Sequence, residues 1–102
     1  MSDSITLPLG DYSGRTYYTS IRATPSFNDP EEFAVTAHYR DRDTDDEIQI
    51  ARIDTAHGYT HFDRLFRRDQ PKERLDVGVW EAAEIIEENW RTYARSYERV
   101  FG

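Results

Sequence analysis

The 102-residue chain carries twenty Asp and Glu against thirteen basic residues, for a net charge of −7, and twelve of the thirteen bases are arginine. It has no cysteine, which excludes disulfides, thiolate metal sites and thiol nucleophiles. The length is that of one domain, and the 14% aromatic content predicts a folded core instead of disorder.

The acid surplus and the single lysine, Lys72, are typical of a halophilic protein. Concentrated counterions screen the self-repulsion of such a chain, because the Debye length falls to about 3 Å at 1 M salt. Arginine still forms geometrically defined ion pairs there. We therefore expect a cytoplasmic protein of a salt-accumulating cell, and this composition favours salt adaptation over mimicry of nucleic acid. No apolar stretch approaches the roughly 20 residues of a membrane span, so no membrane partner is expected.

The first fourteen residues predict a flexible lead-in, because Pro8, Gly10 and Gly14 lie among small and polar residues. Residues 5–9 could add an edge strand to the sheet. A single domain is then expected over residues 15–102.

Four segments of this domain predict antiparallel strands. Residues 15–23, 32–40 and 47–54 alternate in polarity, and residues 61–68 are expected to pair back on the third strand. A turn at His57-Gly58 would set three pairs opposite one another: Ile53 with Phe62, Arg52 with Asp63, and Asp54 with His61. Apolar positions fall on both faces of this last hairpin, which indicates either a bulge or a second covered face.

A C-terminal helix is predicted from about Val77 to Phe101, with Asp76 as its cap. Its apolar stripe comprises Val79, Ala83, Ile86, Trp90, Tyr93, Tyr97 and Val100. The predicted fold is therefore α+β: an antiparallel sheet of three to four strands packed against one long C-terminal helix. Four side chains are expected to be surplus to the helix-facing core and to favour a homodimer through the free sheet face: Tyr18, Ile48, Ile50 and Leu65.

Chemically versatile residues concentrate in the segment 52–63. His57 and His61, with Asp54 to orient one of them, would suit general acid–base catalysis without a metal. Three arginines could hold an anion such as phosphate beside them: Arg52, Arg64 and Arg68. The structural alternative is that His57-Gly58 is only a tight turn and that His61 only pairs with Asp54.

Two further ligand classes receive little support from the sequence. The spacing of His57 and His61 would suit a metal only on a helix, and Gly58 argues against one there, so we expect neither metal nor cofactor. Arg91, Arg95 and Arg99 form a ridge on the predicted helix, yet phosphate binding through counterion release weakens steeply with salt. Nucleic acid is therefore not an expected partner unless its recognition is site-specific.

The pattern Arg-x-Asp-x-Ala-His-Gly-x-x-His, from Arg52 to His61, resembles a group of small uncharacterised prokaryotic proteins, many of them archaeal. It is also similar to toxin–antitoxin components of the TumE type. The resemblance implies that Asp54, His57 and His61 are marked positions, although this chain lacks the dense histidine cluster of the toxin-type proteins.

We expect an interaction or structural module that acts through a sheet face as a homodimer or as the subunit of a protein partner. The alternative function is a metal-independent ribonuclease or phosphodiesterase that uses Asp54, His57, His61 and nearby arginines.

Overall fold

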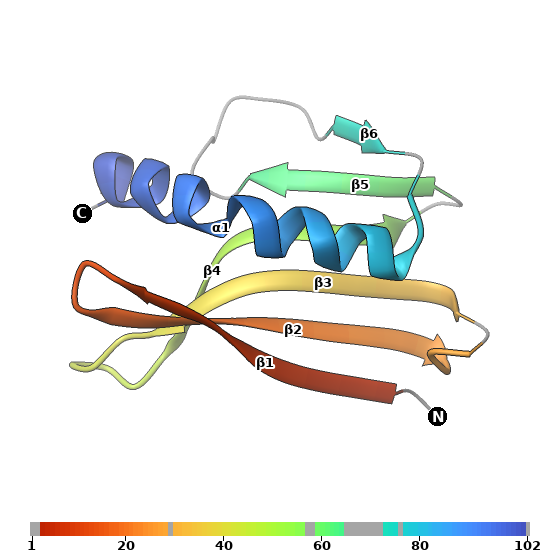
Figure 1. The fold of residues 1–102 in the computed structure, drawn as a ribbon, viewed down its shortest axis with the longest axis horizontal. Coiled ribbons are helices and arrows are strands. Elements are labelled where there is room, and N and C mark those ends of the chain that lie inside the picture. The colour runs from red at the N-terminus through yellow and green to blue at the C-terminus, as the bar shows by residue number, and fades with distance from the viewer. Residues whose placement is uncertain (1–2, 29, 57–58, 65–72, 76, 102) are drawn as a thin grey trace.

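The computed structural model describes residues 3–28, 30–56, 59–64, 73–75 and 77–101. For residues 30, 56, 59–64, 73–75 and 101 the description is confined to the backbone. Six strands pair antiparallel in chain order and one helix follows them (Figure 1). The elements are β1 (Asp3–Tyr12), β2 (Arg15–Pro25), β3 (Pro30–Arg40), β4 (Glu47–Ala56), β5 (Tyr59–Arg64), β6 (Glu73–Leu75) and α1 (Val79–Phe101).

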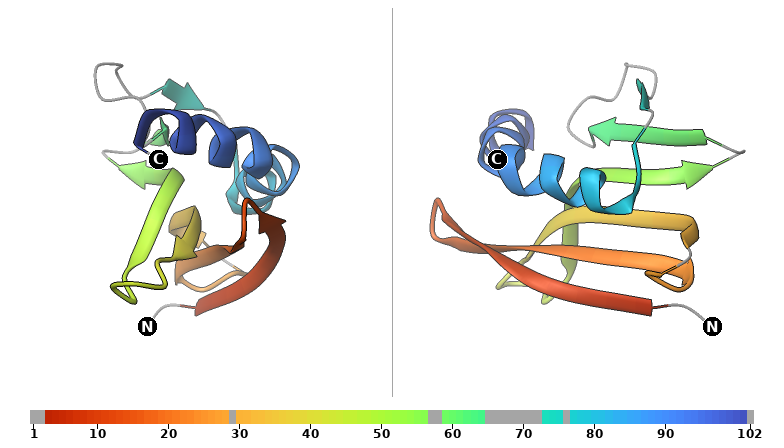
Figure 2. Two further views of the ribbon diagram at one scale, coloured as in Figure 1. Left: turned by 90° about the vertical axis from the view of Figure 1, so that its left-hand side faces the viewer. Right: turned by 45° about the vertical axis from the view of Figure 1, so that its right-hand side comes forward.

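The chain forms two layers, with α1 lying across one face of the sheet (Figures 1 and 2). This confirms the α+β class and the long C-terminal helix. The four predicted strands correspond to β2, β3, β4 and β5, and the predicted register between β4 and β5 is confirmed. β1 and β6 are two strands that the predicted count did not include.

The N-terminal segment differs from the expected flexible lead-in, because Asp3–Tyr12 pairs along β2 as an edge strand. A bulge between Pro8 and Gly10 lets the strand include both of these residues, although each of them suggested a loop. Gly10 has φ of 150°, and a Cβ built there would lie 3.0 Å from the ring of Trp90. Glycine at this position therefore lets the helix pack closely on β1.

A second difference lies after β5. The last predicted strand ends at residue 68, yet Glu73–Leu75 forms a further edge strand, β6, and pairs with β5. The short strand shows that backbone pairing can include a segment whose charged side chains predict a loop.

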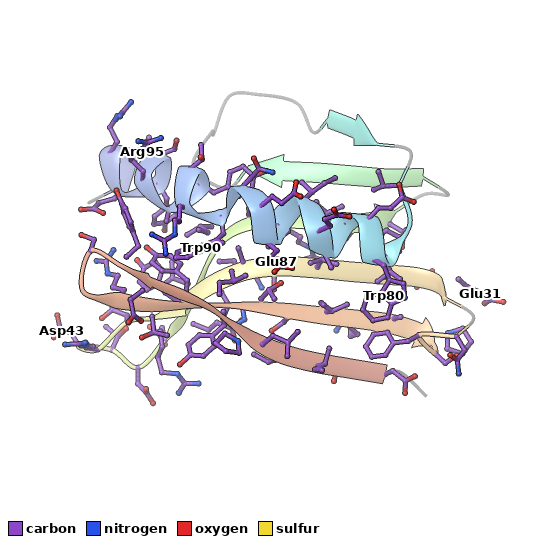
Figure 3. All side chains as sticks on the ribbon, viewed as in Figure 1. Glu31, Asp43, Trp80, Glu87, Trp90 and Arg95 are labelled. Atoms are coloured by element: carbon purple, nitrogen blue, oxygen red, sulfur yellow. The ribbon has the colours of Figure 1, made fainter. Side chains whose placement is uncertain are left out.

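The helix begins at Val79, two residues later than predicted, and Asp76 lies outside the described residues. The backbone N–H of Gly78 donates to Glu81 Oε1 at 3.4 Å, so a first-turn carboxylate accepts one of the free helix-terminal donors. Most of the predicted stripe packs on the sheet, and Trp90 points from α1 towards it (Figure 3). Val100 is an exception, because it is 56% exposed.

A bulge between β3 and β4 decides which residues of β4 face the helix. Ala37 pairs with Ala51 but His38 pairs with Gln49, so Ile50 is the extra residue. Ile50 is fully buried and Ile48 packs against the core. Two of the residues expected to be surplus therefore belong to the core, and Leu65 lies outside the described residues. The homodimer stays a prediction. The two isoleucines cannot contribute to its interface through the free sheet face, because they pack in the core.

Candidate functional site

The face of the sheet that points away from α1, here called the open face, is polar over β1 to β4. Alternation places the core side chains of these strands under α1 and the intervening side chains on the open face. An open hollow of about 440 Å³ is lined from all four strands, by residues that include Ser20, Arg22, Thr36, Gln49 and Arg52. The hollow is concave and several polar side chains converge on it, so it is a candidate ligand site.

A chain of side-chain contacts, here called the relay, crosses the open face from strand to strand. Thr6 Oγ1 lies 3.1 Å from Ser20 Oγ, and Ser20 Oγ lies 2.8 Å from His38 Nε2. His38 Nδ1 lies 3.4 Å from Glu47 Oε1. The carboxylate favours the tautomer with its proton on Nδ1, which leaves Nε2 to accept from the Ser20 hydroxyl. Each of the four strands from β1 to β4 contributes one member.

His38 is the buried member of the relay, with 7% of its surface exposed. Burial lowers its pKa below the ordinary value of 6.5; Glu47 acts in the opposite direction, and Arg40 lowers the pKa further. The Tyr18 ring stacks on the imidazole with 6.0 Å between centroids. The pKa shift keeps His38 neutral near pH 7, the state in which Nε2 can accept a proton.

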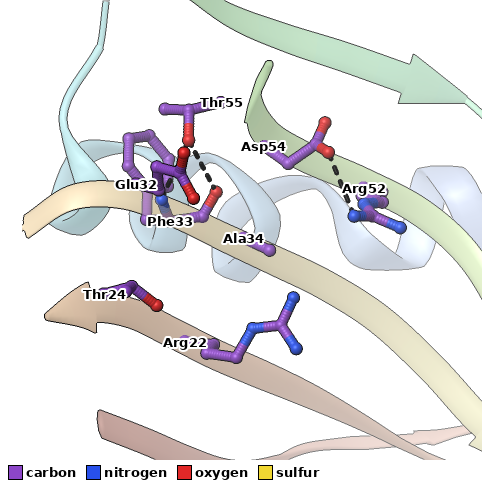
Figure 4. Close-up of a pocket in the computed structure, with 8 residues that line it drawn as sticks. All are labelled: Arg22, Thr24, Glu32, Phe33, Ala34, Arg52, Asp54 and Thr55. Atoms are coloured by element: carbon purple, nitrogen blue, oxygen red, sulfur yellow. Dashed lines mark hydrogen bonds and ion pairs between the residues drawn. The ribbon is translucent and has the colours of Figure 1, made fainter. Parts of the chain in front are cut away.

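A second group, here called the arginine hollow, lies further along the same face. Arg22 of β2 and Arg52 of β4 lie on opposite sides of β3, where Ala34 has too short a side chain to fill the space (Figure 4). Arg52 Nη2 bonds Asp54 Oδ2 at 3.0 Å. Arg52 Nε and Asp54 Oδ1 are both buried and have no hydrogen-bond partner among the described residues. A cationic donor and an anionic acceptor are thus left unused at one hollow of about 150 Å³.

The candidate residues chosen from the sequence are brought together only in part. Asp54 pairs with His61 in the strand register, as predicted, and Arg64 pairs with Ala51. The Asp54 side chain nevertheless bonds Arg52 of its own strand. The side chains of His61 and Arg64, and all of His57 and Arg68, lie outside the described residues.

Sequence reasoning missed Ser20, Arg22 and Glu47 as site residues. A signal existed for the position of His38, which the alternation of residues 32–40 puts on the polar face of its strand. Its partners could not be identified, because they depend on the register of three strands and on a bulge.

Among the side chains that the structure describes, no group of three or more His, Cys, Asp and Glu could hold a metal ion. No helix in the described ranges has both the length and the apolarity needed to cross a membrane.

We predict that the wild-type protein loses stability relative to H38Q as the pH falls below 6.5. The unfolded chain binds a proton at His38 near pH 6.5, whereas burial lowers the pKa of His38 in the folded chain. As the pH falls below 6.5, proton binding therefore stabilises the unfolded chain more than the folded one, and the free energy of unfolding decreases. The difference in free energy of unfolding should change by up to about 1.4 kcal/mol per pH unit. Urea titrations of both proteins between about pH 8 and pH 5 measure it, and groups common to both cancel. A difference that does not vary with pH would contradict the shift.

The comparisons with known proteins give one result. No curated protein and no solved structure matches the chain. The model of a family described as "Domain of unknown function (DUF7718)" matches residues 4–101. Because this match spans all the described elements except Asp3, the first residue of β1, the chain belongs to the DUF7718 family.

Proposed function

We propose that the protein binds an anionic group with a neighbouring hydroxyl, the chemistry of a ribose phosphate, in the arginine hollow. The observation that carries this proposal is a pair of buried atoms, Arg52 Nε and Asp54 Oδ1, that have no hydrogen-bond partner within the described part of the chain. A buried donor or acceptor without a partner costs about 1–3 kcal/mol, and a ligand that supplies both partners removes this cost.

The positive charge of Arg22 supports the proposal that the ligand is an anion. Acids outnumber bases in the chain, yet no ion pair or hydrogen bond to Arg22 is present among the described residues. Its guanidinium lines the same hollow as that of Arg52. Two guanidinium groups across a hollow suit the oxygens of a phosphate, which arginine binds with two parallel hydrogen bonds.

Two carboxylates, those of Asp54 and Glu32, line the hollow and limit which anions fit; Asp54 is the one with a buried oxygen that has no partner among the described residues. Its Oδ1 would repel a bare anion but accepts a hydrogen bond from a hydroxyl. A ligand with a phosphate and an adjacent hydroxyl satisfies the arginines and Asp54 together. This refines the interaction module expected from the sequence: a sheet face is kept as the binding surface, and its ligand is polar.

The predicted salt adaptation is compatible with such a site. We propose that the acid surplus adapts the chain to molar salt, where binding through counterion release contributes little. Contacts that depend on direction, such as a bidentate arginine, weaken less because they act at short range in a partly buried place.

The free energy of unfolding in urea should be larger in about 2 M KCl than in about 0.2 M KCl. Equal or lower stability in the concentrated salt would contradict the adaptation.

We predict that adenosine 3′-phosphate binds in about 2 M KCl and that R22Q and R52Q each weaken binding at least about tenfold, because each removes a charge-assisted hydrogen bond. The 2′-deoxy analogue, which lacks the adjacent hydroxyl, should bind more weakly than the ribose form. Calorimetry measures the affinities. R95Q is the matched control, because Arg95 is exposed at the far end of α1 (Figure 3). Equal affinity of R22Q, R95Q and wild type would exclude the arginine hollow as the binding site.

A second candidate function is the metal-independent ribonuclease or phosphodiesterase. The specific observation is the backbone pairing of Asp54 with His61, which places a histidine position directly beside the hollow. In this reading Asp54 orients His61 as the base, His57 is the acid, and the arginines hold the phosphate.

We predict that the protein cleaves single-stranded RNA in the presence of a chelator and leaves 2′,3′-cyclic phosphate ends, because a base beside the phosphate would activate the 2′-hydroxyl. Gel electrophoresis and mass spectrometry of the products identify the ends. The H57A/H61A double variant should lose cleavage, and H38A, with its histidine on another strand pair, should retain it. Cleavage that survives in the double variant would refute the assignment.

A further inference from the structure

We propose that Ser20 is an acyl-transfer nucleophile activated by His38 and Glu47, and that its substrates are short-chain esters whose acyl group ends in a carboxylate. The serine half of this inference is independent of the proposed function. The charge of the substrate rests on it, because Arg22 would hold the carboxylate.

The geometry of the relay matches what a serine nucleophile requires. A base must accept the hydroxyl proton, and an acid must orient the base from its other nitrogen. Ser20 Oγ lies 2.8 Å from His38 Nε2, and Glu47 Oε1 lies on the Nδ1 side at 3.4 Å. Since the Ser20 proton points to Nε2, the Thr6 hydroxyl at 3.1 Å donates to Ser20 Oγ and holds it in place.

Ser20 is accessible to a substrate, whereas its base is sheltered. Ser20 is partly exposed and lines the hollow of about 440 Å³, while His38 is 7% exposed. Thr36 and Gln49 line the same hollow and offer a hydroxyl and an amide to the oxyanion that develops on the acyl carbon. Hydrogen bonds that only joined the strands would not require a serine hydroxyl among the residues that line the hollow.

The substrate class follows from Arg22, which lies two residues from Ser20 on the same face of β2. This spacing is about 7 Å along the strand, within reach of the arginine side chain. A carboxylate at the end of a four-carbon acyl chain can therefore meet the guanidinium while its ester carbon meets Ser20 Oγ. Ile5, Ile21 and Ala34 also line this hollow, so the preference for a carboxylate rests on the charge of Arg22 and not on a lack of apolar surface.

The reaction balances without a further reactant but water. Ser20 Oγ bonds to the acyl carbon, its proton passes to His38 Nε2, and the bond from the acyl carbon to the alcohol oxygen breaks as that oxygen takes the proton. Water then gives a proton to Nε2, its oxygen bonds to the acyl carbon, and Ser20 Oγ leaves and recovers the proton. The products are the alcohol and the dicarboxylic acid.

The test compares two nitrophenyl esters of equal chain length, 4-nitrophenyl hemisuccinate and 4-nitrophenyl butyrate. The free carboxylate of the hemisuccinate also attacks its own ester, so the release measured with S20A is subtracted for each ester. The remaining release by wild type should be faster from the hemisuccinate, and mass spectrometry of the quenched enzyme should find the succinyl group on Ser20. S20A should lose the adduct, and H38A should slow its formation at least about 100-fold. S4A is the control, because Ser4 lines the same hollow but has no His partner among the described residues.

The variants separate this inference from the proposed function. R22Q should keep the adduct at Ser20 but lose the preference for the hemisuccinate. No acyl group on Ser20, in an enzyme that still binds adenosine 3′-phosphate, would overturn the nucleophile and leave the proposed function intact. An adduct with no preference between the two esters would overturn the assigned substrate class.

Discussion

The open face depends on one irregularity of the sheet, the bulge where Ala37 and His38 of β3 meet β4. With strict alternation, Ile48 and Ile50 would lie beside His38, and Glu47 would point at the helix. The extra residue reverses this phase: both isoleucines join the core, and Glu47 comes within 3.4 Å of His38 Nδ1. One inserted residue thus completes the core and supplies the carboxylate of the relay.

The same face carries two groups with different electrostatic character. The relay is built around a buried imidazole whose pKa is lowered by burial, so its resting state is neutral. The arginine hollow is built around charges that are permanent near neutral pH. Arg22 and Arg52 line both hollows, so an anion held by these arginines would lie next to the nucleophile of the relay. The two proposals both assign a role to Arg22 but depend on different chemistry.

The strands that the sequence predicted well are those with a single interior face. Residues 32–40 alternate so regularly that their helix-facing side could be assigned at once, and the hairpin register around Asp54 followed from a turn at His57-Gly58. β1 was harder, because Pro8 and Gly10 also suit a loop and only the contact with Trp90 explains the glycine. The start of α1 depends on a capping interaction of Glu81 that residue preferences do not single out.

The relay could not be predicted, because its members come from four strands and no two of them lie within eight residues of one another in the sequence. Local patterns report which face a residue occupies, and pairing across strands reports which residues meet. Only the second kind of information brings Ser20 to His38, and it includes a bulge that a period-two pattern cannot express.

Asp54 illustrates how a correct residue can acquire a different role. The sequence paired it with His61, and the backbone register agrees, but its Oδ2 accepts from Arg52. A carboxylate has two oxygens, and the second, Oδ1, is buried with no partner among the described residues. The Arg52 contact fixes the orientation of the carboxylate, and the free oxygen can then accept from a hydroxyl of a ligand or from an imidazole N–H. Both occupants require the Asp54 carboxylate to be held in a fixed orientation, so Arg52 is the positioning residue in either case. Binding and catalysis then differ in which group reaches Oδ1.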